Sequence, residues 1–331
     1  MACVPVSEAM DTAIRPVEHD LEAHRRELTG YCYRMLGSGA DAEDAVQETM
    51  VRAWRGIDRL DAPEALRSWL YRIATNVCLD MLNGAQRRAQ PIDLGPASTA
   101  ESALGAKLGE ESWVLPVADS RVLPESGDPA ELAAARETVR LAFVAALQLL
   151  PPRQRAALIL CEVLRWKASE AAELLGTTTA GVNSALQRAR ATLDAAELDT
   201  AGAAAADSEA EQELLDRYVD AFERYDMDAL VALLHEDATF SMPPYPLWLQ
   251  GREQVRAWLL GKGIGCRGSR VLQVAANGGP AFATYRPAGP GTHEPFALVV
   301  MKVENGKVCD LCHYLYSELF PAFGLPERLE S

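Results

Sequence analysis

The amino-acid sequence predicts a multidomain protein in which two all-α modules precede an α+β domain. The length of 331 residues is too great for one small domain. Apolar residues recur at spacings of three and four over residues 20–88 and again over 129–195, as in amphipathic helices. Beyond residue 212, helical spacing gives way to strand-like runs such as FALVVMKVE at 296–304. The remaining segments are predicted as an N-terminal tail at 1–19 and linkers at 89–128 and 196–211.

The composition predicts a globular protein of the cytoplasm. Hydrophobic residues make up 49% of the chain and charged residues 24%. No apolar run approaches the 18 residues of a membrane span. The first 20 residues are acidic where an export signal would be basic. Seven scattered cysteines, an odd number, suit free thiols in a reducing compartment.

The net charge of −15 argues against a protein that binds DNA on its own, because phosphate neutralisation needs clustered Lys and Arg. The charge is unevenly distributed. Residues 151–195 contain six Lys or Arg and four Asp or Glu, whereas 196–215 contain six acids and no base. A locally basic module therefore lies within an acidic protein, and any DNA contact depends on a larger complex.

The first helical module contains an amphipathic helix of about four turns at 66–82. We assign Trp69 to its buried stripe. Its outward face carries the residues Arg67, Ser68, Tyr71, Arg72, Asn76, Asp80 and Asn83. Arginine neutralises phosphate, asparagine pairs with a base edge, and an aromatic ring stacks on an unpaired base. Considered alone, this face is better explained as a solvated helix surface.

An acidic cluster precedes this helix: Asp41, Glu43, Asp44 and Glu48. Carboxylates near a helix start are stabilised by the positive end of the helix dipole. The same cluster could also dock a basic partner surface, and the residues alone leave both explanations open.

The runs DAEDAVQETMVRAWR at 41–55 and LRSWLYRIATNVCLDML at 66–82 resemble region 2 of extracytoplasmic-function sigma factors of the sigma-70 family. The resemblance implies that the first run docks on the clamp helices of the largest RNA polymerase subunit. The residues implied in docking are Asp41, Glu43, Asp44, Gln47 and Glu48. The second run would melt and capture the −10 promoter element. The residues implied there are Arg67, Tyr71, Arg72, Asn76 and Asp80. MLNGAQRR at 81–88 departs from the family, which often continues directly into basic residues.

The second helical module contains a predicted helix-turn-helix at 166–193. Ala172 is small where two helices cross, Gly176 can supply the left-handed turn, and Val182 packs back between the helices. The outward positions of the second helix suit base edges and phosphates. They are Thr179, Asn183, Ser184, Gln187, Arg188 and Arg190. A generic helical hairpin is the alternative.

Preceded by LPPRQR at 150–155, this pattern resembles sigma region 4, which implies recognition of the −35 element. Two such modules in this order, joined by a linker, predict a sigma factor. The expected partners are core RNA polymerase and promoter DNA, with no enzymatic activity and no membrane association.

Residues 212–320, with a tail at 321–331, form a C-terminal extension, hereafter the extension. Its segments 214–244 and 246–259 resemble the opening of SnoaL-like domains, which are cone-shaped α+β barrels. Further strands are expected at 270–276, 281–286, 296–303 and 307–316. The motifs NGGP at 277–280 and FGLPERL at 323–329 resemble motifs of such extensions. The resemblance implies contacts back onto the helical modules, and we expect the extension to regulate activity.

A cone-shaped barrel has a pocket, for which His235, Trp248 and His313 are the lining candidates. Further candidates are Asp237, Tyr245, Glu294 and Tyr314. Acid–base catalysis needs two titratable groups that converge on one substrate, which the sequence does not show. We therefore predict no catalytic residue and no cofactor. Regulation or packing without a ligand is favoured, and a small-molecule ligand remains an alternative.

Residues Cys309 to His313 match C-x-x-C-H, the attachment motif of c-type haem. The motif lies in a strand-like run, where residues three apart face opposite sides. This geometry is poor for a shared metal or a disulfide, so neither haem nor metal is expected.

Two other classes of protein remain as alternatives. One is a SnoaL-like enzyme or ligand sensor with a helical DNA-binding arm. The other is a stand-alone helix-turn-helix regulator, which the net charge disfavours.

Overall fold

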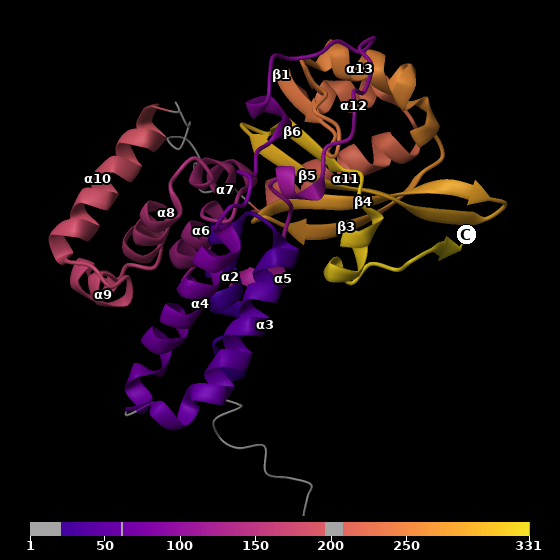
Figure 1. Ribbon diagram of the computed structural model, residues 1–331. Helices are drawn as coiled ribbons and strands as arrows, with labels where there is room; N and C mark the ends of the chain where they lie inside the picture. The colour runs from indigo at the N-terminus through magenta and orange to yellow at the C-terminus, as the bar shows by residue number, and fades with distance from the viewer. Residues whose placement is uncertain (1–20, 61, 196–207, 331) are drawn as a thin grey trace, which may run out of the picture.

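The computed structural model describes residues 21–60, 62–195 and 208–330 (Figure 1). The expected tail at 1–19 and most of the linker at 196–211 lie outside these ranges. None of the helices in the described ranges is long and apolar enough to span a membrane.

The first helical module is a bundle of three helices, with short 3-10 turns between the last two. The helices are α2 (Arg25–Leu36), α3 (Gly39–Gly56) and α4 (Leu66–Leu82), and the turns are Ile57–Arg59 and Pro63–Ala65. Gly37 ends α2 with a left-handed φ of 73°, and the Ser38 hydroxyl caps α3 by accepting from the Asp41 backbone N–H at 3.2 Å. The tight α2–α3 corner therefore places the acidic cluster in the first turns of α3.

The second helical module contains the predicted helix-turn-helix. Its helices are α6 (Pro129–Glu137), α7 (Leu141–Leu147), α8 (Pro152–Leu158), α9 (Ala168–Leu174) and α10 (Thr179–Ala195), with a π-helical turn at Ile159–Val163. Gly176 has a φ of 62° in the turn between α9 and α10. Ala172 and Val182 are 4% and 1% exposed, because they pack where the two helices cross.

The segment between these modules, expected as a linker, is ordered and packed. It contains short helical turns at Pro91–Asp93, Glu110–Ser112 and α5 (Asp119–Val122). Trp113, Val114 and Leu115 are at most 1% exposed. Leu115 donates from its backbone N–H to Gly37 at 2.8 Å and accepts from the Tyr33 hydroxyl at 2.9 Å. Its apolar run therefore forms part of the core.

The extension contains a mixed sheet with strand order β2-β1-β6-β5-β4-β3, and β7 pairs with β5. The strands are β1 (Leu234–Ser241), β2 (Trp248–Gln250), β3 (Arg270–Ala276), β4 (Gly279–Gly289), β5 (Thr292–Glu304), β6 (Lys307–Tyr314) and β7 (Leu329–Glu330). The helical elements are α11 (Ser208–Glu223), α12 (Met227–Leu233), α13 (Arg252–Leu260) and 3-10 turns at Lys262–Cys266 and Ser317–Phe323. β1 and β6 are parallel, and the other pairs are antiparallel. The four strands expected from the sequence are present.

The sheet is buried on both faces by different partners. Helices α11 to α13 cover one face, where Phe240, Phe282 and Leu311 lie in an apolar cluster with residues of these helices. On the opposite face, Val300 and its strand partner Cys312 belong to the same core as the helical modules. Figure 1 shows α2 and α5 beside this face. The extension therefore packs against both helical modules through one continuous core.

The centre of this interface is the turn between β3 and β4. Asn277 is 2% exposed and has a left-handed φ of 54°. Its amide nitrogen donates to the Tyr33 hydroxyl at 2.6 Å and to the Val139 carbonyl at 2.7 Å, and its amide oxygen accepts from the Val117 N–H at 3.1 Å. The expected contact of NGGP with the helical modules is confirmed, and one side chain joins both modules and the segment between them.

The second motif, FGLPERL, packs partly on its own sheet. The Tyr285 hydroxyl donates to the Pro326 carbonyl at 2.9 Å, and Leu329 pairs with His293. Phe323 also lines a small cavity with Gly39 and Ala40 at the start of α3. The tail therefore lies against the first helical module as well.

Gly278 allows the β3–β4 turn to approach the second helical module. A Cβ atom at this position would lie 2.6 Å from the Arg136 carbonyl oxygen. The Gly278 N–H donates to the Asp119 carboxylate at 2.8 Å. Burial raises the pKa of Asp119 to about 6, despite this hydrogen bond and the nearby charges of Arg136 and Arg140.

We predict that Asp119→Asn stabilises the protein at neutral pH. The pKa of Asp119 is higher in the folded state than in an unfolded chain, because the buried carboxyl is more stable when it is protonated. The protonated carboxyl therefore contributes fully to folding stability below about pH 4, and this contribution is lost as the pH rises through about 6. The Asn variant should unfold at a temperature a few degrees higher at neutral pH, a gain of about 1 kcal/mol. The difference should vanish at about pH 4.

Calorimetry at several pH values measures this difference. Asp237→Asn, at an exposed aspartate of β1, is the control and should leave the pH profile unchanged. A gain independent of pH for Asp119→Asn would contradict the assignment.

Candidate functional site: polymerase and nucleic-acid interfaces

The acidic face of α3 is partly engaged by arginines from other segments. Asp41 pairs with Arg88 at 2.5 Å, and Glu43 pairs with Arg121 at 3.5 Å. Asp44, Gln47 and Glu48 are exposed, as expected for a docking surface. The structure thus places the five predicted residues on one helix. Asp41 and Glu43 are held by Arg88 and Arg121, and Glu48 pairs with Arg52 of the same helix at 2.7 Å.

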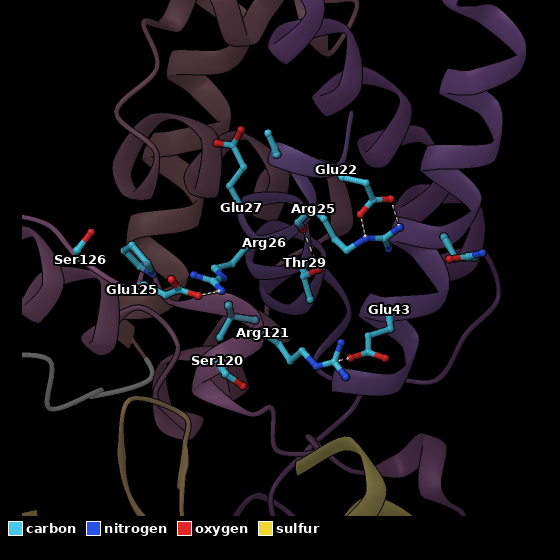
Figure 2. Close-up of a pocket in the computed structure, with 14 residues that line it drawn as sticks. Glu22, Arg25, Arg26, Glu27, Thr29, Glu43, Ser120, Arg121, Glu125 and Ser126 are labelled. Atoms are coloured by element: carbon cyan, nitrogen blue, oxygen red, sulfur yellow. Dashed lines mark hydrogen bonds and ion pairs between the residues drawn. The ribbon is translucent and has the colours of Figure 1, made fainter. Parts of the chain in front are cut away.

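A groove of about 970 Å³ borders this face (Figure 2). The groove is lined by residues from 22–29 at the start of the bundle, by Glu43 and Gln47 of α3, and by residues from 120–126. Arg25 pairs with Glu22 at 2.6 Å, and Arg26 pairs with Glu125 at 2.5 Å. With the Glu43–Arg121 pair, each of these three arginines is neutralised, so the groove has no strong preference for an anion.

The outward face of α4 is only partly exposed. Arg72, Asn76 and Asp80 are exposed as predicted, and Trp69 packs against the core as predicted. Tyr71, in contrast, is 0% exposed, which corrects its predicted place on the outward face. Its ring lies between Tyr31 and Trp166, with centroid distances of 5.2 and 5.1 Å. The tyrosine is buried because the second helical module covers this part of α4.

Arg67 is held at the same place by contacts on three sides. Its guanidinium lies 5.1 Å from the Tyr71 ring centroid and 5.6 Å from that of Trp166. It donates to both Glu27 oxygens, with the shortest contact at 2.9 Å. Burial tends to raise the pKa of Glu27, but hydrogen bonds from Arg67 and His24 lower it below its usual value. The charge of Arg67 is therefore balanced by Glu27, and its guanidinium makes its contacts within the protein.

A second ion pair crosses between the two modules beside Arg67. Arg72 on α4 lies 3.3 Å from Glu173 on α9. Both side chains are largely exposed, so this pair contributes little energy by itself. Trp166 and Glu173 together cover the end of α4 that carries Arg67, Tyr71 and Arg72.

The outward face of α10 is exposed throughout. All six predicted residues, Thr179, Asn183, Ser184, Gln187, Arg188 and Arg190, are exposed. Arg188 donates to the Ser184 hydroxyl at 2.6 Å, and Arg190 pairs with Glu162. In Figure 1, α10 lies at the edge of the molecule remote from the extension. This helix presents its polar side chains together, as major-groove recognition requires.

The structure does not bring the three pocket candidates together. His235 is exposed near the start of β1, and the Trp248 indole donates to the Gly95 carbonyl at 2.9 Å on the face toward the helical modules. His313 stacks on Phe240 at 4.2 Å on the helix-covered face, where burial lowers its pKa to about 4. The further candidates are also dispersed: Asp237 and Glu294 are exposed, Tyr245 is half-buried, and Tyr314 is buried in the shared core.

The C-x-x-C-H motif lies on β6. Cys312 is 2% exposed in the core shared with the helical modules, whereas Cys309 is half-buried. Both thiols are free, as are those of Cys32, Cys78, Cys161 and Cys266.

Comparison with known proteins agrees with this architecture. The family model of sigma-70 region 2 matches residues 21–88, that of sigma-70 region 4 matches 140–193, and that of the SnoaL-like domain matches 215–311. The ECF RNA polymerase sigma factor SigG of Mycobacterium tuberculosis is 45% identical over 93% of this chain and 83% of its own length. The chain belongs to the extracytoplasmic-function RNA polymerase sigma factors. The predicted family is confirmed, and sigma factors are transcription factors rather than enzymes.

Another relative of this sigma factor has a known structure. The M. tuberculosis sigma factor SigJ is 29% identical over 93% of this chain and 95% of its own length. The crystal structure of SigJ matches 93% of this chain and all of that chain, with a TM-score of 0.62 and 25% identity. The predicted fold, helical sigma modules followed by a SnoaL-like α+β domain, is therefore confirmed.

Two buried arginines of this sigma factor, which the sequence did not predict as important, join the helical modules. Arg34 of α2 donates to the Thr138 hydroxyl at 2.7 Å and to its carbonyl at 3.1 Å. Arg155 of α8 donates to the Met35 carbonyl and to the Leu150 carbonyl at 3.1 Å. Burial lowers the pKa of each arginine to about 10, so both remain charged at neutral pH. Separating the modules would break the Arg34 bonds to Thr138 and the Arg155 bond to Met35, whereas the bonds of Arg34 to Gly30 and of Arg155 to Leu150 lie within one module.

Proposed function

We propose that this sigma factor docks on core RNA polymerase through the acidic face of α3. Asp41, Glu43, Asp44, Gln47 and Glu48 would form the contact. The support is their common position on one helix whose cap, Ser38, fixes its start. The exposed members Asp44 and Glu48 would make the first contact.

We further propose that α10 binds the −35 element and α4 binds the −10 element. The six exposed side chains of α10 provide the donors and acceptors for the major groove. On α4 the proposed contacts are Arg67, Tyr71, Arg72, Asn76 and Asp80. The net charge of −15 fits a protein that works in the cytoplasm within a polymerase complex, where the polymerase supplies most of the non-specific attraction to DNA.

The extension, in this proposal, regulates the sigma factor by favouring a closed form. The observation that carries it is the buried Asn277 amide, which bonds both helical modules and the segment between them. In the closed form, Tyr71 is covered by Trp166 and Arg67 is engaged by Glu27 and the Trp166 ring. Asp41 and Glu43 are held by Arg88 and Arg121. Polymerase and promoter would bind the open form better and so shift the population toward it.

We predict that reversing two charges on α3, Asp44→Lys with Glu48→Lys, weakens core polymerase binding by at least about tenfold, because the docking surface loses its charge complementarity. Fluorescence anisotropy of labelled sigma factor with core enzyme measures the effect. The matched control is Glu213→Lys with Glu236→Lys, at two exposed positions of the extension. Equal affinities for the two double variants would reject α3 as the docking surface.

We predict that Arg188→Ala lowers transcription from a promoter that requires the −35 element by about tenfold, because one contact to a base or phosphate is worth about 1–3 kcal/mol. Binding to core polymerase should be unchanged. Arg224→Ala, at an exposed arginine directly after α11, serves as the control. Unchanged transcription with Arg188→Ala would exclude this residue from −35 recognition.

We predict that Asn277→Ala opens the closed form and increases core binding and transcription at limiting sigma factor. The substitution removes three buried hydrogen bonds, each worth about 1 kcal/mol. Asn305→Ala is a matched control, because Asn305 has a similar φ of 51° in an exposed hairpin turn.

Hydrogen exchange of the two variants separates opening from unfolding. Opening should raise exchange in residues 113–118 and at the β3–β4 turn while the helices remain protected. Output equal to that of Asn305→Ala, with the interface open, would show that the extension does not regulate.

A further inference from the structure

A cavity of about 190 Å³ lies where the sheet meets the second helical module. Thr239, Ser241 and Asp310 line it from β1 and β6, and Trp248 lines it from β2. Its opposite walls are residues 90–92 of the connecting segment and 140–142 at the start of α7. It lies on the sheet face toward the helical modules and is therefore separate from the interior of the cone.

The lining of this cavity contains one carboxylate, Asp310, and two cationic side chains, Arg140 and Lys302. Arg140 is held by Glu137 at 2.8 Å and lies 3.7 Å from Glu211, and Lys302 pairs with Glu304 at 2.6 Å. Asp310 accepts from the Thr239 hydroxyl. Within the described ranges, no Lys, Arg or His nitrogen forms an ion pair with Asp310. Burial has the larger effect on the pKa of this carboxyl and raises it, whereas Lys302, which lies opposite Asp310 in the β5–β6 pair, lowers it.

The remaining lining is apolar enough to hold a ring. Trp248, Ile92, Leu141 and Val300 all contribute to the walls. The volume is below the range of about 300–1,000 Å³ that is common for drug-sized ligands. A ligand must therefore be small, with a cationic hydrogen-bond donor at one end and an apolar body at the other.

We propose that this cavity binds a small primary amine, with its ammonium group on Asp310 and an apolar ring against Trp248. Because both the extension and the second helical module form the walls, the bound amine stabilises the closed form. This last step rests on the proposed regulatory function, whereas binding itself does not.

The first test is binding of benzylamine to the full chain without polymerase, followed by NMR of the Trp248 indole N–H. The resonance is assigned with Trp248→Phe. We expect saturable binding at millimolar concentration. Asp310→Asn should weaken it by about tenfold or more, because a charge-assisted hydrogen bond is lost. Asp237→Asn is the control at an exposed aspartate and should bind as the parent does.

Two further probes examine the ligand class. Benzyl alcohol keeps the ring without the charge, and phenylacetate reverses the charge, so both should bind at least about tenfold more weakly than benzylamine. The site is overturned if benzylamine does not perturb the Trp248 signal, if Asp310→Asn binds equally, or if phenylacetate binds as well as the amine.

The second test measures transcription with and without benzylamine. Output should fall for the parent protein but not for Asp310→Asn, which controls for any effect on core polymerase itself. If binding is present but the two proteins respond alike, the coupling is overturned and the site stands. If Asn277→Ala also fails to change output, the proposed regulation is wrong independently of the site.

Discussion

The arrangement of this sigma factor depends on the need to satisfy one buried amide. Asn277 is enclosed at the junction of three segments, and each of its side-chain hydrogen bonds goes to a different one. A buried polar group that loses its partner costs about 1–3 kcal/mol, which is large compared with a marginal stability. The hydrogen bonds of Asn277 therefore favour the observed orientation of the β3–β4 turn against both helical modules.

This arrangement affects the exposure of the two proposed DNA-binding faces, α10 and α4, to different extents. The α10 face remains exposed, whereas Tyr71 of α4 is covered by Trp166 and the acidic face of α3 is partly held by arginines. In the proposed opening, the contacts that would break around region 2 are mostly aromatic and charged. Arg34 and Arg155 add buried charges that are hydrogen-bonded across the boundary between the two helical modules. Opening consequently requires a partner that compensates for several polar groups together.

Structural features that depend on local sequence patterns could be predicted from the sequence alone. Gly176, Ala172 and Val182 define the helix-turn-helix by spacing, and the apolar stripe of α4 follows from its period. The sequence did not predict the burial of a residue where a distant segment of the chain packs against it. Tyr71 occupies an outward position of its own helix and is buried only because Trp166, nearly a hundred residues later, covers it. Likewise, Trp113 stands in a stretch rich in Gly and Pro, and only its apolar neighbours Val114 and Leu115 hinted at a core position. The cavity beside Asp310 joins residues from three segments and has no sequence signature.

The position of Asn277 in the chain has a consequence for synthesis. Both helical modules are complete at residue 195, but the turn that locks them emerges from the ribosome about 80 residues later. At bacterial elongation rates of 5–20 residues per second, this delay lasts roughly 4–16 seconds. During that interval the nascent chain carries its promoter-binding modules without their lock. Under the proposed regulation, each molecule of this sigma factor would be open when its helical modules fold and would close only when its translation is nearly finished.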